Sequence, residues 1–138
     1  MWARLRNALV TVTAAATALV TTASPAAAVV DPYPAFSCRY DIKDEWPGGF
    51  MADIYVLNKS AALTTWVVRW RFNQPTRIGA VWDAVIRQDP YGTVLATPGP
   101  FNANVRPYAV FSFGWSGFAA TTEVPNYITV NNYLCFRA

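Results

Sequence analysis

Thr65-Trp66-Val67-Val68-Arg69-Trp70-Arg71-Phe72 is the stretch that decides the fold class. Its large apolar side chains alternate with other residues, so that Trp66, Trp70 and Phe72 share one face and the two arginines share the other. A period of two is typical of a β-strand with one buried face. We therefore expect Trp66, Trp70 and Phe72 in a core and the arginines in solvent.

The same alternation occurs in other segments of the chain. Residues 50–57 place Phe50, Ala52, Ile54 and Val56 on one face, and further strands are expected at 105–115 and 127–136 and, shorter, near 78–81, 85–88 and 93–96. Proline and glycine recur between these runs, and no segment has a sustained helical period. The pattern predicts an all-β, antiparallel β-sandwich of jelly-roll or immunoglobulin-like type with about eight or nine strands, and with Phe111 and Phe113 in its core.

The N-terminal segment resembles an export signal. Arg4 and Arg6 precede an apolar run from Ala8 to about Ala23, and small residues follow up to Ala28. This arrangement predicts a secretory signal peptide over residues 1–28. A membrane anchor is the alternative, but the run is short and contains several threonines. We expect an extended lead-in over 29–36, one domain over 37–138 that acts as a stand-alone module, and a secreted protein.

The charge balance limits the possible partners. The predicted leader holds two of the 11 Lys and Arg residues, so nine remain against eight Asp and Glu. The mature chain is nearly neutral and has no run of basic residues, which disfavours nucleic acid and anionic membranes as partners. We expect a monomer that has no membrane contact after signal cleavage.

The chain contains two cysteines, Cys38 and Cys135, which are 97 positions apart. In an exported protein such a pair is expected to form a disulfide. Two free thiols are the alternative. The bridge would join the first strand to the last.

The chain lacks residues that many catalytic mechanisms use. The sequence contains no histidine, which removes Ser-His-Asp and Cys-His arrangements and histidine metal sites. Asp44 and Glu45 are adjacent, and neighbours on a strand point to opposite faces, which disfavours a paired-carboxylate glycosidase. We expect no enzyme activity, no metal site and no cofactor.

Three aromatic residues lie beside turn residues, where a side chain tends to face solvent. Trp46 precedes Pro47-Gly48, Trp82 precedes Asp83, and Phe101 follows Pro100. Exposed large rings are unusual on a soluble domain and are suited to stacking on sugars. The alternatives are that Trp46 covers an edge of the sandwich, that Trp82 packs inward with Ile78, and that Phe101 is buried. Asn102 and Gln88 are candidates for hydrogen bonds to sugar hydroxyls.

The order of these signals resembles a family 2 carbohydrate-binding module of the bacterial cellulose-binding type. The resemblance rests on several short segments between the two cysteines: Cys38-Arg39-Tyr40, residues 46–58, residues 66–72, Ile78 with Trp82-Asp83-Ala84, Phe101-Asn102 and residues 113–117. It covers essentially all of the predicted mature chain.

The resemblance implies a planar strip of three exposed aromatics, here Trp46, Trp82 and Phe101, that stacks on glucan. Phe101 occupies a position where the family has tryptophan. Xylan-binding members carry an arginine at the position of Gly49 and lack the middle tryptophan, so the resemblance implies a cellulose binder, with chitin and xylan as alternatives. A function of another class, a secreted protein-interaction or inhibitor domain with the aromatic patch as a hot spot, stays open.

Overall fold

The computed structural model describes residues 14–16, 18–23 and 34–138. The first two ranges have no regular secondary structure, and the expected cleavage site after Ala28 lies outside the described residues. The β-strands all belong to the unit Asp31–Ala138. Among the described residues there is no helix long and apolar enough to cross a membrane.

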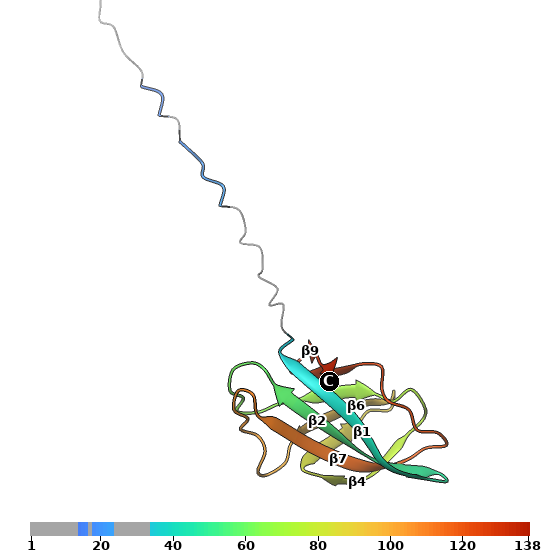
Figure 1. Cartoon of the computed structure of the whole chain (residues 1–138). Coiled ribbons are helices and arrows are strands. Elements are labelled where there is room, and N and C mark those ends of the chain that lie inside the picture. Colours follow the sequence, from blue (N-terminus) through green and yellow to red (C-terminus); the bar gives the residue numbers. More distant parts are fainter. Residues whose placement is uncertain (1–13, 17, 24–33) are drawn as a thin grey trace, which may run out of the picture. The chain divides into compact units, whose positions relative to one another are not determined.

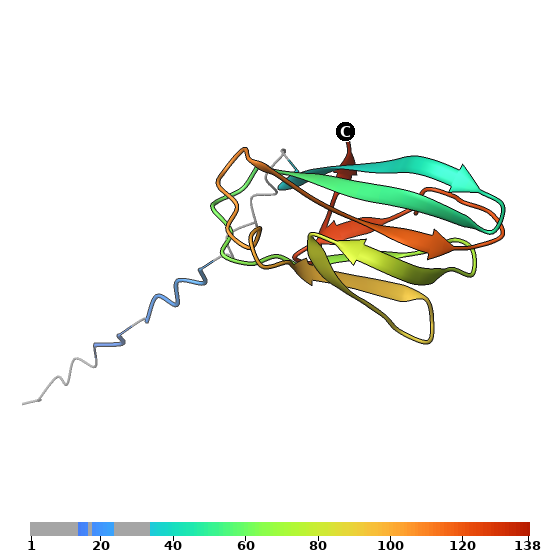
Figure 2. The same ribbon diagram turned by 90° about the horizontal axis from the view of Figure 1, so that it is seen from below.

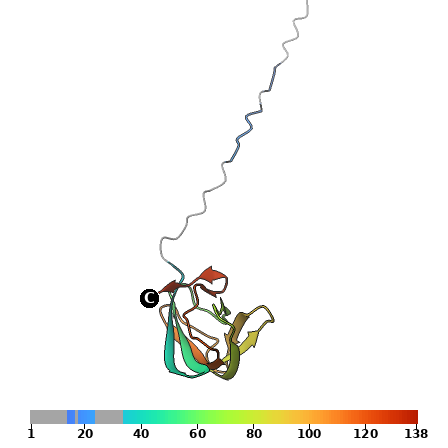
Figure 3. The same ribbon diagram turned by 90° about the vertical axis from the view of Figure 1, so that its right-hand side faces the viewer.

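In the part of the chain that the structure describes, ten strands form two five-stranded sheets. Figure 1 shows their arrangement. The first sheet has the order β10-β1-β2-β7-β4, with β1 Phe36–Trp46, β2 Gly49–Asn58, β4 Arg77–Trp82, β7 Val110–Phe118 and β10 Phe136–Arg137. The second has the order β5-β6-β3-β8-β9, with β3 Val68–Arg71, β5 Ala84–Gln88, β6 Thr93–Pro98, β8 Ile128–Val130 and β9 Tyr133–Leu134. Figures 2 and 3 show the two sheets as separate layers. The predicted all-β sandwich is confirmed.

The core lies between the sheets and is rich in aromatic residues. Trp66 is fully buried, and its ring stacks on Phe111 and Phe113 at centroid distances of 4.5 and 5.4 Å. Trp70 and Phe72 are also buried, and their rings meet edge to face with centroids 6.1 Å apart. The core assignment made from the period of two is therefore confirmed for all five residues.

The predicted disulfide is confirmed. Cys38 of β1 bonds Cys135, and their Cα atoms are 5.6 Å apart. The bridge lies where β10 pairs in parallel with the start of β1. It therefore ties the last residues of the chain to the first strand of the sandwich.

Several expected strands have different bounds, and the division of one of them raises the strand number of the described residues to ten. The stretch 65–72 is a strand only over Val68–Arg71. The segment 127–136 is divided because Asn131 and Asn132 have φ of 49° and 68°, which suits the two-residue turn between β8 and β9. The strand expected from Val105 begins only at Val110, since Tyr108 has a φ of 61° and interrupts the extended backbone. A period of two cannot reveal these interruptions.

Candidate functional site

One face of the first sheet is turned away from the core, and we call it the outer face. On β2 and β7 it carries residues of alternating positions, namely Gly49, Met51, Asp53, Tyr55, Ser112, Gly114, Ser116 and Phe118. Gly49 pairs with Phe118, and Asp53 pairs with Gly114, so these residues form rows across the strands. These two rows continue onto β1, at Trp46 and Asp41, and onto β4, at Arg77 and Trp82.

Trp46 reaches the outer face because β1 contains a bulge. The pairing of β1 with β2 shifts register between Ile42 and Asp44. Ile42 pairs with the buried Ala52, whereas Trp46 pairs with Gly49 of the outer face. Strict alternation from Ile42 would have placed Trp46 on the core side; the extra residue reverses that parity.

The Trp46 ring lies against the backbone of Gly49. A Cβ atom at Gly49 would come within 2.7 Å of Cε2 and 2.9 Å of Cζ2 of the indole, so only glycine leaves room for this ring position. The two-residue connection Pro47-Gly48 closes the hairpin, with a φ of 86° at Gly48. Trp46 remains 42% exposed, which is not the burial expected of a lid over the sandwich edge.

Trp82 reaches the same face through a second bulge. The pairing of β4 with β7 shifts between Ile78 and Val81. Ile78 and Val81 pair with core-side residues and pack against the core, while Trp82 pairs with Gly114. Ile78 and Trp82 would share a face in a regular strand, so the bulge separates them. A Cβ atom at Gly114 would collide with the Trp82 indole, which therefore lies over that glycine.

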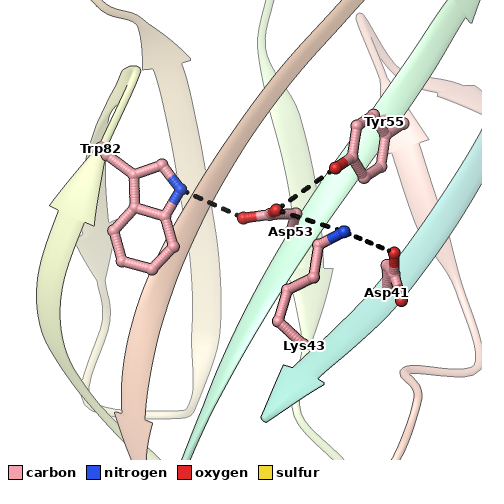
Figure 4. Close-up of polar contacts among 5 residues, drawn as sticks. All are labelled: Asp41, Lys43, Asp53, Tyr55 and Trp82. Carbon is pink, nitrogen blue, oxygen red and sulfur yellow. Dashed lines mark hydrogen bonds and ion pairs between the residues drawn. The ribbon is translucent and has the colours of Figure 1, made fainter.

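Asp53 holds the Trp82 ring in place (Figure 4). Its Oδ1 accepts a hydrogen bond of 3.1 Å from the indole Nε1 of Trp82, and its Oδ2 accepts one of 3.4 Å from the Tyr55 hydroxyl. Asp53 lies within the strand expected over residues 50–57. Its position on the same face as Tyr55 was readable from the alternation, but its pairing with Trp82, 29 positions away, was not.

Lys43, the extra residue of the β1 bulge, completes this network. Its Nζ is 2.8 Å from Asp41 Oδ2 and 3.9 Å from Asp53 Oδ2. The hydrogen bond from Lys43 lowers the pKa of Asp41, and the same bond raises the pKa of Lys43 to about 12. Both groups therefore keep their charges over a wide pH range around neutrality.

Phe101 is fully exposed, at 100% of its surface, which excludes its burial in the core. It lies in the loop after β6, close to the point where the chain leaves Trp82 for the second sheet. A hollow beside this loop is lined by Phe101 and Asp83 and, from β7, by Val110 and Ser112. The Phe101 loop therefore borders the β7 side of the outer face.

Asn102 holds this loop to the corner at Asp83. The side-chain amide of Asn102 donates a 2.7 Å hydrogen bond to the backbone carbonyl of Asp83. The backbone carbonyl of Asn102 accepts a 2.8 Å hydrogen bond from the indole of the buried Trp66. Asp83 has a φ of 60° at the turn between β4 and β5. Because Phe101 precedes Asn102 and Trp82 precedes Asp83, this bond keeps the two aromatic residues near each other.

Gln88 differs from the other predicted residues in its location. It ends β5 of the second sheet, and its Nε2 donates a 2.7 Å hydrogen bond to the carbonyl of Thr76, just before β4. The structure thus brings Trp46 and Trp82 onto one face, with the Phe101 loop at its border, and places Gln88 on the second sheet.

Within the described residues no group of three or more acidic or cysteine side chains is arranged to hold a metal ion.

Comparison with known proteins identifies the family. Residues 36–135 match the family described as cellulose binding domain. The chain is 28% identical over 87 residues to a lytic cellulose monooxygenase of Streptomyces ambofaciens, covering 62% of this chain and 24% of that protein. It is 34% identical over 106 residues to endo-1,4-beta-xylanase B of Cellvibrio japonicus, covering 74% of this chain and 16% of that protein. The chain therefore spans less than a quarter of the length of these relatives.

Solved structures agree on the fold. The chitin-binding domain of Chi18aC from Streptomyces coelicolor superposes with a TM-score of 0.62 at 24% identity, covering 73% of this chain and 94% of that domain. The cellulose-binding family 2 carbohydrate-binding domain of ScLPMO10C superposes with a TM-score of 0.53 at 23% identity, covering 74% and 94%. The match over residues 36–135 means that the chain belongs to the cellulose-binding domain family, family 2 of the carbohydrate-binding modules, and that these residues form a non-catalytic polysaccharide-binding module.

Proposed function

We propose that the outer face of the first sheet binds insoluble β-1,4-linked glucan, with cellulose as the preferred polymer, by stacking Trp46, Trp82 and Phe101 on its sugar rings. The observation that carries the proposal is the position of Trp46, exposed and laid against Gly49. A pyranose ring has an apolar face of C–H groups, and an indole matches it in size while few rotamers are lost. We call Trp46, Trp82 and Phe101 the aromatic strip.

The spacing of the supporting glycines favours an extended polymer over a single sugar. Gly49 pairs with Phe118, and Gly114 is four residues earlier on the same strand, which corresponds to about 13 Å along β7. This span exceeds one pyranose ring, so Trp46 and Trp82 would contact sugars that are not neighbours. Phe101, in the loop held to Asp83, would extend the strip beyond Trp82.

The expected affinity follows from the number of rings. Stacking of a nucleic-acid base on an aromatic side chain is worth about 1–3 kcal/mol, and a sugar face offers a similar contact. Three such contacts together contribute about 3–9 kcal/mol. A dissociation constant of about 1 μM corresponds to about 8.2 kcal/mol, so micromolar affinity lies near the upper end of this range. Stacking on an exposed face needs no pocket, which suits an insoluble polymer as the ligand.

Gly49 supports cellulose over xylan. Any side chain at this position would push the Trp46 ring away from the sheet and tilt the strip. The relatives include enzymes named for cellulose and for xylan, and structural neighbours include chitin-binding domains, so xylan and chitin are the competitors to test.

Asn102 and Gln88 stay proposed site residues with different roles. The amide of Asn102 is engaged with Asp83, and we propose that it positions Phe101 rather than bonding sugar directly. The amide of Gln88 is engaged with Thr76, so a sugar contact there would require that bond to exchange. Replacing each by alanine and measuring cellulose affinity would assign both.

We further propose that the protein is secreted and acts as a monomer. The Cys38–Cys135 disulfide supports export, because such bonds persist in oxidising compartments. The relatives named above are polysaccharide-degrading enzymes, and a secreted module would meet the same substrates. Mass spectrometry of the exported protein would locate the leader cleavage, and sedimentation would determine the oligomeric state.

Binding isotherms on microcrystalline cellulose, chitin and insoluble xylan test the proposal. Trp46→Ala and Trp82→Ala should each weaken cellulose binding and leave the melting temperature nearly unchanged. Tyr127→Ala is the matched control, because Tyr127 is a 72% exposed aromatic that precedes β8 of the second sheet. If the wild-type protein binds none of the three polymers but forms a stable complex with another protein, the aromatic strip is a protein-interaction hot spot and the proposal is wrong.

A further inference from the structure

A fourth aromatic ring lies on the outer face beside the aromatic strip. Phe118 ends β7, is 45% exposed, and pairs with Gly49, the residue against which Trp46 lies. It is four residues along β7 from Gly114, the support of Trp82. Phe118 therefore occupies the β4 side of the strip at its Trp46 end.

The Phe118 ring has a defined position. A Cβ atom at Gly79 would come within 3.0 Å of its Cε2 and within 2.8 Å of the Ser116 hydroxyl, so the ring extends over the glycine of the β4 bulge. On β4, Arg77 pairs with Phe118, and its guanidinium carbon is 4.3 Å from the centre of the phenyl ring. This is the geometry of a cation–π contact.

The Arg77 guanidinium has hydrogen-bonding capacity to spare. Among the described residues it makes no salt bridge within 4.0 Å, and no hydrogen bond from its side chain is present. A guanidinium carries five N–H donors and stacks on an aromatic face without using them. The Phe118 ring thus holds a planar donor group next to the strip and leaves its edge available.

A stacked glucan presents acceptors on this flank. When a β-glucopyranose ring lies flat on an indole, its equatorial hydroxyls point sideways in the plane of the sugar. Groups at the sides of the aromatic strip therefore meet hydroxyls, whereas the strip itself meets C–H groups. The strip has two flanks. The flank on the β2 side contains the Asp53–Lys43 network, and the flank on the β4 side contains Arg77.

We propose that Arg77 and Phe118 form a sugar-contacting pair in which the phenyl ring positions the guanidinium and the guanidinium donates hydrogen bonds to glucan hydroxyls beside Trp46. This inference rests on the proposed function of the outer face. It assigns to one flank of the strip the polar contacts that orient the bound chain. Neither residue was singled out by the sequence, because Phe118 and Arg77 are 41 positions apart and meet only through the β4–β7 pairing.

The test uses a matched arginine. Arg39 of β1 also lies over an aromatic ring of the outer face, with its guanidinium carbon 4.4 Å from the centre of the Tyr55 ring. The row of paired residues that contains Arg39 is separated by two other rows from the row that contains Phe118. Arg77→Ala and Arg39→Ala therefore remove the same charge and the same kind of contact. Isotherms on microcrystalline cellulose would be measured for both variants, for Arg77→Lys and for Phe118→Leu, together with their melting temperatures.

Arg77→Ala should weaken cellulose binding about fivefold, the effect of losing one hydrogen bond of ordinary net strength, while Arg39→Ala stays within about twofold of wild type. Arg77→Lys, which keeps the charge but not the planar fork, and Phe118→Leu, which removes the stacking ring, should lie between them. Melting temperatures should be unchanged in all four.

Three results would overturn the proposal in distinguishable ways. Wild-type binding by Arg77→Ala, with Trp46→Ala still defective, would refute the role of the pair but leave the aromatic strip in place. Equal losses in Arg77→Ala and Arg39→Ala would indicate a general charge effect. A wild-type protein that binds no polysaccharide would refute the proposed function of the face, and this inference with it.

Discussion

Gly49→Ala isolates the role of the Trp46 ring position, because it adds one methyl group beneath the ring and changes nothing else. The new Cβ would lie 2.7 Å from Cε2 and 2.9 Å from Cζ2 of the indole, whereas carbon atoms in favourable contact are about 3.5–4.0 Å apart. The ring must therefore move outward by about 1 Å. The backbone of Gly49 has no positive φ, so alanine fits its conformation.

The magnitude follows from this displacement. A gap of 0.5–1 Å forfeits about a quarter to a half of a van der Waals contact. Applied to a stacking contact of about 1–3 kcal/mol, the loss is about 0.3–1.5 kcal/mol. Cellulose binding should therefore weaken about two- to tenfold, because each 1.4 kcal/mol is a factor of ten. The free energy of unfolding should stay level or rise, since alanine is favoured over glycine in a strand by about 0.5–1 kcal/mol.

The control is the neighbouring glycine. A Cβ atom at Gly48 meets nothing within 4 Å, but Gly48 has a φ of 86°. Gly48→Ala should therefore lower the melting temperature through backbone strain of about 1–2 kcal/mol and leave cellulose affinity nearly intact. Cellulose isotherms and thermal denaturation of both variants would show opposite patterns. If Gly49→Ala binds cellulose as tightly as wild type, the position of Trp46 does not determine binding, and the reasoning fails.

Four further outcomes are expected. Trp66→Ala should destabilise the domain by about 3–5 kcal/mol, measured by denaturant unfolding, because it empties the stack with the core phenylalanines and removes a hydrogen bond to the Phe101 loop; a change below 1 kcal/mol would contradict its core role. Phe101→Trp should tighten cellulose binding by less than about 1.5 kcal/mol at constant melting temperature, since a larger ring is added to a fully exposed position; weaker binding would remove Phe101 from the strip. Reduction of Cys38–Cys135, which closes a loop of nearly 100 residues worth about 4.7 kcal/mol in the chain-entropy model, should lower the melting temperature with little effect on the affinity of the protein that remains folded. Cellulose affinity should be level from pH 5 to 8, because the chain has no histidine, the pKa of Asp41 is lowered and the pKa of Lys43 is raised to about 12. The contribution of Asp41 to stability is present above its unfolded pKa and is lost only as the pH falls through its lower folded pKa. A steep change of affinity within this window would point to another titrating group.

The sequence was sufficient for the architecture of the domain. Alternation in residues 65–72 and 50–57 identified strands and their buried faces, because one face of a sandwich sheet excludes water along its whole length. The two cysteines predicted their own bridge, since no other partner exists in the chain. The buried positions of Trp66, Trp70 and Phe72 followed from the same alternation and are found as predicted.

The placement of the aromatic strip was decided only by the tertiary structure. Trp46 shares the core-side parity of Ile42 along its strand, and Trp82 shares that of Ile78, yet each lies on the outer face after a bulge. A bulge depends on how a strand pairs with its neighbour, and that pairing is a contact between distant residues which no local pattern records. The same holds for Asp53 and Trp82, and for Arg77 and Phe118: the side chains meet because β2, β7 and β4 are adjacent in one sheet. Local alternation therefore indicates which side chains of a regular strand are buried, while strand pairing and its bulges determine where Trp46 and Trp82 lie and which exposed groups act together.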